Sequence, residues 1–249
     1  MTGETGEITG SKMAFWESKQ KILVILAHPD DPEFFCGATI AKWTAEGHHV
    51  AYCLLTKGDK GVNDHFSKVE NIRELRIEEQ YNAAKVIGVT DISFLDNEDG
   101  YLTPNMELRK EVAGVIRKAK PDIVVTCDPT NYYLRDSYIN HPDHRAAGQV
   151  VIDAVFPAAQ NFLFFPELEK ELHLEPHHVK EVWISLPKEA NVAIDVTDTW
   201  AKKLEALTKH ASQIGEIDQF YKRMRSRHTE DSSDESPRYE EVYRRIVFT

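Results

Sequence analysis

Histidines and aspartates gather in two short segments of this 249-residue chain. One segment reads His-Pro-Asp-Asp at residues 28–31, and the other reads His-Pro-Asp-His at residues 141–144. Two histidines and one carboxylate are a familiar ligand set for a catalytic zinc ion, which keeps a fourth position for water. We therefore take His28, Asp31 and His144 as candidate metal ligands.

Asp30 lies beside these candidate ligands without being required as one. Water bound to zinc has its pKa lowered towards ~7, but it still needs a positioned base to accept its proton when it attacks. Asp30 suits that role. The same ligand set also suits iron(II), so the residues leave the metal open. For His141 a catalytic role has a structural alternative, because this side chain could instead cap the following helix or bond a backbone carbonyl.

Both segments are expected to follow parallel strands. Residues 21–27 form a continuous aliphatic run, as in a central strand covered on both faces, and the run ends at His28. Residues 122–127 form a similar run before the second segment. Ligand sites in open α/β sheets lie outside the carboxyl ends of the strands, so the two segments can meet at one site.

The whole chain alternates strands and helices, which predicts an α/β fold with a mostly parallel sheet and right-handed crossovers. We expect a flexible extension at residues 1–18, a single domain at 19–249 and, within it, a mobile loop rich in serine and charge at 223–238. Further strands are expected at 49–56, 91–95, 181–186 and 191–196. Helices are expected at 37–46, from Thr103-Pro104, from His144 onward, and over 200–214. One more helix is expected whose apolar side carries Leu75, Ala83, Ala84 and Ile87.

Composition excludes several classes of protein. The formal net charge of −11 argues against binding to nucleic acid, which requires a basic footprint. No window approaches the ~18 uncharged apolar residues of a membrane span, and the N-terminus does not resemble a signal peptide, so we expect a cytoplasmic protein. The three cysteines lack CxxC spacing and are expected to be small buried residues. No dinucleotide fingerprint, Walker sequence or GxSxG nucleophile motif occurs.

Several motifs together point to one family. They are AHPDD at residues 27–31, CGATIAKW at 36–43 and HPDHRAAG at 141–148, with weaker matches at 76–89, 94–100 and 203–213. In these motifs the chain resembles the LmbE-like or PIG-L family of zinc-dependent N-deacetylases, over roughly residues 21–220. Two positions depart from the family pattern: Pro32 directly follows HPDD, and Cys36 stands where the family usually has a first glycine.

The resemblance implies an LmbE-like deacetylase fold, a Rossmann-like three-layer sandwich. It implies that His28, Asp31 and His144 bind zinc and that Asp30 is the general base. It also implies that His141, oriented by Asp143, protonates the leaving amine or stabilises the oxyanion.

Substrate contacts are expected from Arg76, or from Arg73 as the second match, by the same resemblance. The alternative for Arg76 is an exposed partner of Glu78 or Glu79. His210 lies in a family-like segment, where it either packs and caps a helix or stands near the active site of its own or a neighbouring subunit.

The implied activity is hydrolysis of the acetyl amide of an N-acetylglucosamine-type sugar or a related small molecule. Two alternatives stay open: an amidase acting on a larger N-acyl or thiol-conjugate substrate, and a non-catalytic sugar-binding protein. The family resemblance also favours a homo-oligomer, a trimer or hexamer. Residues of the loop before His141 either line the substrate pocket or cover it, namely Tyr132, Tyr133, Arg135 and Tyr138.

Overall fold

The computed structural model describes residues 16–62, 70–134 and 138–248. Its centre is a seven-stranded sheet in the order β3-β2-β1-β4-β5-β7-β6. Strands β1 to β5 pair in parallel, and β7 runs antiparallel to both β5 and β6. The strands are β1 Lys21–Leu26, β2 His49–Thr56, β3 Asp91–Asn97, β4 Ile123–Cys127, β5 Glu181–Ser185, β6 Val192–Asp195 and β7 Glu240–Val247.

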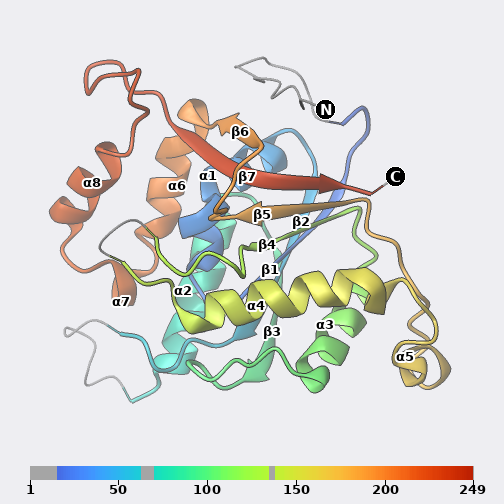
Figure 1. Ribbon diagram of the computed structural model, residues 1–249. Helices are drawn as coiled ribbons and strands as arrows, with labels where there is room; N and C mark the ends of the chain where they lie inside the picture. Colours follow the sequence, from blue (N-terminus) through green and yellow to red (C-terminus); the bar gives the residue numbers. More distant parts are fainter. Residues whose placement is uncertain (1–15, 63–69, 135–137, 249) are drawn as a thin grey trace.

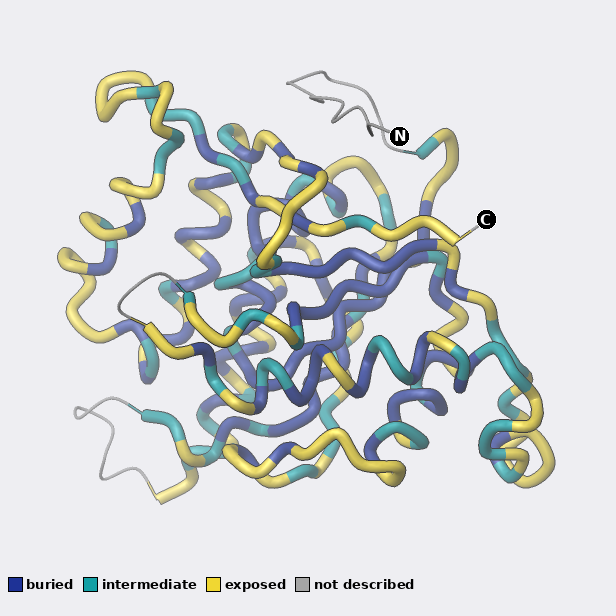
Figure 2. Tube along the Cα trace, in the orientation of Figure 1, coloured by how far each residue is buried: buried dark blue, intermediate teal, exposed yellow. Residues whose placement is uncertain are grey.

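Helices cover both faces of this sheet (Figure 1). On one face α6 packs against α1 and α2, and on the other α3 packs against α4 and η2. The tube in Figure 2 is dark blue along the central strands, because β1 and β4 are buried on both sides. The helices are α1 Asp31–Ala45, α2 Ile72–Val86, α3 Met106–Ala119, α4 Pro142–Asp153, η2 Ala154–Ala159, α5 Pro166–Lys170, η3 Thr197–Thr199, α6 Trp200–Leu207, α7 Ala211–Ile214 and α8 Ile217–Arg225.

The order of the strands reverses between β1 and β4. The chain runs outward from β1 through β2 to β3, and then returns across β1 to β4 and β5. Such a reversal opens a crevice at the carboxyl ends of the two central strands, where ligands bind in open α/β sheets. The expected α/β fold with its mostly parallel sheet is confirmed, and each His-Pro-Asp segment follows one of the two strands that flank this crevice.

Helix α1 begins earlier than expected and is broken in the middle. It starts at Asp31, since Pro32 is tolerated in a first turn, and its backbone leaves helical geometry at Cys36 (φ −145°, ψ 16°). Glu241 of β7 repairs the break, because its carboxylate accepts the backbone N–H groups of Ala38 and Thr39 at 3.2 and 2.8 Å. The Lys203 ammonium lies 2.6 Å from the same carboxylate.

Three other sequence expectations differ from the structure. The helix expected at Thr103 starts at Met106, because the side chain of Asn105 accepts the N–H of Leu108 and caps it. The single helix expected over residues 200–214 is divided into α6 and α7, with His210 just before α7. Helix α2 does not turn a purely apolar side inward: its buried residues are Arg76, Glu79, Gln80, Ala83 and Ala84.

Candidate metal centre and general base

The two His-Pro-Asp segments meet at the crevice between β1 and β4. Nitrogens of His28, His141 and His144 lie within 4.8 Å of one another, a spacing that could hold a metal ion. Asp31 contacts two of these histidines, with Oδ2 3.4 Å from His28 Nδ1 and Oδ1 3.1 Å from His144 Nε2. Ligand atoms about 2.1 Å from a tetrahedral zinc are roughly 3.4 Å apart, so these separations fit ligands of one ion.

The outer nitrogen of each candidate histidine ligand meets an oxygen atom. His28 Nε2 lies 3.1 Å from Asp99 Oδ1 and 3.1 Å from Asp143 Oδ2. His144 Nδ1 lies 3.0 Å from the side-chain oxygen of Asn140. A histidine that binds metal almost always donates its other N–H in this way, which fixes the tautomer and leaves the inner nitrogen free to bind.

Charges at this cluster favour a cation. Burial opposes protonation of His28, but the carboxylates of Asp31, Asp143 and Asp99 outweigh it and raise its pKa well above the usual range. Burial alone would raise the pKa of Asp99, but hydrogen bonds from His28 and the Lys60 backbone, together with the charges of His28 and Arg76, lower it to about 2. The three carboxylates around His28 therefore suit a cation at this place.

Helix α4 brings His144 to the centre through a close approach to β4. A Cβ atom added at Gly148 would lie 2.2 Å from the carbonyl oxygen of Cys127, so only glycine lets the helix pass at this distance. His141 caps the same helix, with Nδ1 accepting the backbone N–H of Asp143 at 3.2 Å. Burial lowers the pKa of His141, which favours the neutral imidazole, and because Nδ1 accepts this N–H, the neutral ring carries its proton on Nε2.

Asp143 supports His28 rather than His141 with its carboxylate. Its oxygens accept the backbone N–H groups of Gly100 and Leu102 at 2.7 and 3.2 Å, in addition to meeting His28. The resemblance assigns Asp143 the orientation of His141; in the structure that contact runs through the Asp143 backbone. Asp99 belongs to the same carboxylate cluster and was not singled out from the sequence.

Asp30 has a strained backbone and a largely buried carboxylate (13% exposed). Its φ of 91° is in a region that costs a residue other than glycine about 1–3 kcal/mol. Burial raises the pKa of its carboxyl to about 6, although the Arg76 guanidinium 3.2 Å away opposes the rise.

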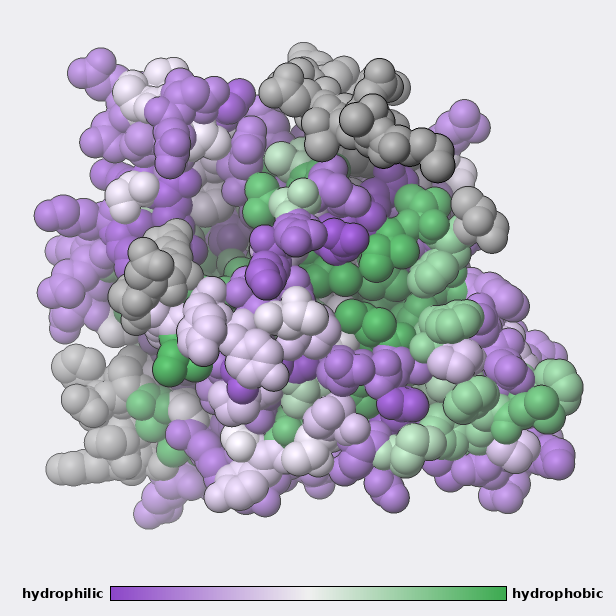
Figure 3. Space-filling model, in the orientation of Figure 1, coloured by the Kyte–Doolittle hydropathy of each residue, from purple (hydrophilic) through white to green (hydrophobic). Residues whose placement is uncertain are grey.

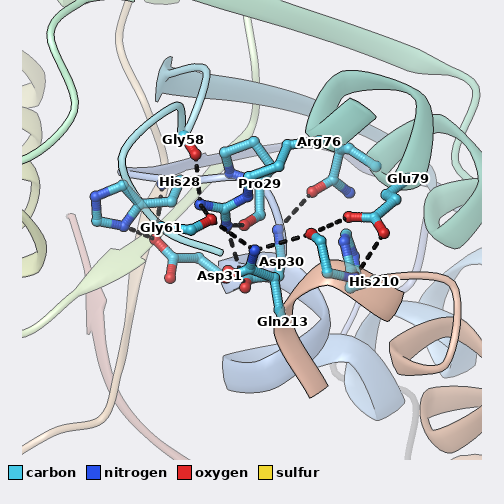
Figure 4. A network of polar contacts seen from close by, with 12 residues as sticks. His28, Pro29, Asp30, Asp31, Gly58, Gly61, Arg76, Glu79, His210 and Gln213 are labelled. Carbon is cyan, nitrogen blue, oxygen red and sulfur yellow. Dashed lines mark hydrogen bonds and ion pairs between the residues drawn. The ribbon is translucent and has the colours of Figure 1, made fainter. Parts of the chain in front are cut away.

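Arg76 is buried beneath this turn, not exposed beside Glu78 or Glu79 (Figure 4). Its guanidinium donates to the carbonyl oxygens of Pro29 at 2.6 Å and Gly58 at 2.8 Å. Gly58 leaves the room it needs, since a Cβ there would lie 2.5 Å from Arg76 Nη1.

The other expected substrate contacts lie further out. Arg73 forms surface ion pairs with Asp96 and Asp59 at 3.1 and 3.4 Å. Tyr138 is exposed on the loop before His141, as are Tyr132 and Tyr133, whereas Arg135 is outside the described residues. In Figure 3, residues of intermediate hydropathy gather at the centre of the face where Figure 1 draws this loop.

His210 lies on the inner side of the Asp30 turn. This position supports the alternative that His210 stands near the site, rather than the alternative that it caps a helix. It is fully buried, and its Nε2 lies 3.2 Å from Glu33 Oε2. Its segment is tied to α2 through Glu79, whose carboxylate accepts from the backbone N–H and the hydroxyl of Ser212 at 2.8 and 2.6 Å.

Comparison with known proteins gives a consistent result. Residues 23–155 match the PIG-L family model, described as GlcNAc-PI de-N-acetylase. The chain is 36% identical to diacetylchitobiose deacetylase of Thermococcus kodakarensis over 200 residues, 79% of this chain and 71% of the relative. It is 28% identical to the probable N-acetyl-alpha-D-glucosaminyl L-malate deacetylase 2 of Bacillus anthracis, covering 80% of this chain and 83% of the relative.

A solved structure extends the likeness to three dimensions. The N,N'-diacetylchitobiose deacetylase of Pyrococcus horikoshii superposes with a TM-score of 0.80 at 28% identity, over 92% of this chain and 84% of the other. No helix among the described residues is both long and apolar enough to cross a bilayer.

Proposed function

The chain belongs to the PIG-L family, and from this we propose that it is a metal-dependent hydrolase that removes the acetyl group from an N-acetylglucosamine-type amino sugar. One observation carries the proposal: a carboxylate that is not a candidate ligand, that of Asp30, lies beside a cluster of two histidines and an aspartate at the sheet's ligand-binding crevice. A site for binding alone has no use for this extra carboxylate.

We assign the metal to His28, Asp31 and His144, because Asp31 contacts both imidazoles, and zinc is the metal that this donor set favours. When bound, the ion would polarise the acetyl carbonyl and lower the pKa of water. The carboxylates of Asp99 and Asp143 and the amide of Asn140 keep the two imidazoles in the ligating tautomer. Metal analysis of the purified protein tests zinc against iron(II).

Two residues move protons in the proposed reaction. The Asp30 carboxylate accepts a proton from the attacking water, while the Arg76 guanidinium at 3.2 Å keeps the carboxylate aimed at the site. His141 holds its proton on Nε2, where it donates to the tetrahedral oxyanion or to the departing amine. The products are acetate and a free amino sugar.

Acetate release from N-acetylglucosamine and diacetylchitobiose tests this proposal. We expect the wild type to release acetate and Asp30→Asn to lose about 10²–10⁴-fold in turnover, the usual contribution of a general base. Metal content is expected to stay equal in the two proteins, because Asp30 is not a proposed ligand. Full activity of Asp30→Asn would remove its assigned role, and a metal-loaded wild type that releases no acetate from either sugar would reject the function.

A further inference from the structure

The peptide bond between Pro29 and Asp30 is held at both of its polar groups by one face of α2. Arg76 donates to the Pro29 carbonyl at 2.6 Å, and the Gln80 side-chain oxygen accepts the Asp30 N–H at 2.8 Å. Arg76 and Gln80 are four residues apart, so they lie on the same side of the helix. Both are buried, which shields the two hydrogen bonds from water.

This peptide determines the direction of the Asp30 carboxylate. Asp30 has the positive φ of 91°, a conformation that the backbone relieves by rotating the preceding peptide. That rotation would turn the Pro29 carbonyl and the Asp30 N–H away from α2 and would break both hydrogen bonds. The contacts with α2 therefore oppose relief of the strain at Asp30.

Glu33 decides which end of the Gln80 amide faces Asp30. The amide nitrogen of Gln80 donates to both carboxylate oxygens of Glu33, at 3.0 and 3.1 Å. Its oxygen is thereby turned toward the Asp30 N–H; the reversed amide would oppose donor to donor and acceptor to acceptor. His210 Nε2, 3.2 Å from Glu33 Oε2, completes the series.

We propose that Gln80, Glu33 and His210 are positioning residues, which keep the Asp30 carboxylate in its reactive orientation without touching substrate. All three are fully buried. Packing alone would not need a carboxylate, an amide and an imidazole in matched donor and acceptor order. The inference rests on the proposed function of Asp30, and it assigns a role to buried polar residues that the reaction itself does not use.

Gln80→Glu interrupts this series of hydrogen bonds with almost no change in the shape of the side chain. The new side chain has no N–H to donate to Glu33, so two carboxylates oppose each other, and their repulsion moves the new oxygen away from the Asp30 N–H. We expect kcat to fall about 100-fold, the effect of a displacement near 1 Å at a reacting group. KM should stay within about threefold and metal content should not change, because the substituted atom lies behind Asp30, away from the substrate.

The double variant Glu33→Gln/Gln80→Glu supplies the decisive comparison. It exchanges amide and carboxylate, so an amide again donates to a carboxylate, and a carboxylate oxygen again faces the Asp30 N–H. We expect kcat to return to within about fivefold of wild type. Gln20→Glu is the matched control, since Gln20 is also buried but bonds Ser18, and it should retain wild-type kcat.

A crystal structure of Gln80→Glu gives a readout that does not depend on activity. We expect the Pro29–Asp30 peptide to be rotated and φ of Asp30 to be negative. Wild-type kcat in Gln80→Glu, or a folded double variant no faster than the single one, would overturn the inference. An inactive wild type would reject the proposed function instead, and an unrotated peptide in the variant crystal would still reject the positioning role.

Discussion

The two His-Pro-Asp segments share three residue types but are stabilised in different ways. Residues 28–31 form a strained turn, and distant side chains keep its Pro29–Asp30 peptide in place. Residues 141–144 form a regular helix start, in which His141 caps α4 and Pro142 occupies the first turn. The first segment thus depends on tertiary contacts, and the second mostly on its own helix.

The third position of each segment shows what this difference means. Asp30 keeps its carboxylate at the edge of the site, beside Arg76. Asp143 is fully buried and bonds two backbone N–H groups and His28. The same tripeptide therefore leaves one aspartate at the edge of the crevice and buries the other as support, so a role cannot be transferred between repeated motifs by their letters alone.

The largest contrast is expected between Asp143→Asn and Asp30→Asn. An asparagine at 143 cannot accept all three hydrogen bonds, so we expect the free energy of unfolding to fall by about 3 kcal/mol. Asp30→Asn should lower it less, because burial already disfavours the Asp30 charge and Arg76 keeps its hydrogen bonds to the carbonyls of Pro29 and Gly58. Urea unfolding of the metal-free proteins measures both values, and equal midpoints would show that the two aspartates do not differ as described.

Asn140→Ala tests the support of the second segment. Loss of the oxygen that meets His144 Nδ1 should weaken metal binding about 10–100-fold, the usual effect of removing such a partner. At saturating metal, kcat should stay near that of the wild type, unlike in Gln80→Glu. Titration in metal buffers measures the affinity, with the remote Asn191→Ala as control. Unchanged affinity would contradict the assignment of His144 as a ligand.

Gly58→Ala tests the support of residues 28–31 from a position outside that segment. Both Gly58 and Gly215 have positive φ, 66° and 67°, but only at Gly58 would a Cβ strike another group, the Arg76 guanidinium. Alanine is strained at positive φ in either variant, at a cost of about 1–3 kcal/mol. We expect Gly58→Ala alone to lower kcat, by about tenfold, through the displaced Arg76. Equal kcat in the two variants would show that Arg76 does not support Asp30.

The central strands could be predicted because both of their faces are buried. Because these strands have no polar face, the apolar runs at 21–27 and 122–127 are continuous in the sequence. The observed strands Lys21–Leu26 and Ile123–Cys127 confirm both predictions. The first His-Pro-Asp segment was visible for the same reason, since it follows such a run directly, whereas the second comes after a loop at residues 128–140. The meeting of the two segments then depends on the strand reversal between β1 and β4.

The support behind Asp30 was not predictable from local patterns. An apolar inner side was expected for α2, but its inner face is partly polar, because Arg76, Glu79 and Gln80 bond groups of distant segments. Gln80 meets Asp30 and Glu33 from about fifty residues away, and no periodicity encodes those partners. Asp99 lies within the weaker family match at 94–100 but was not singled out, since its bond to His28 exists only once β3 is in the sheet.

The cap that Glu241 places on the broken helix α1 has a consequence for the timing of synthesis. Its partner Thr39 is made 202 residues earlier. At ~5–20 residues per second, the nascent chain carries α1 without this cap for roughly 10–40 s. During that interval the helix that bears Asp31 and Glu33 lacks this cap, so the candidate metal centre can reach its final form only after β7 has been synthesised.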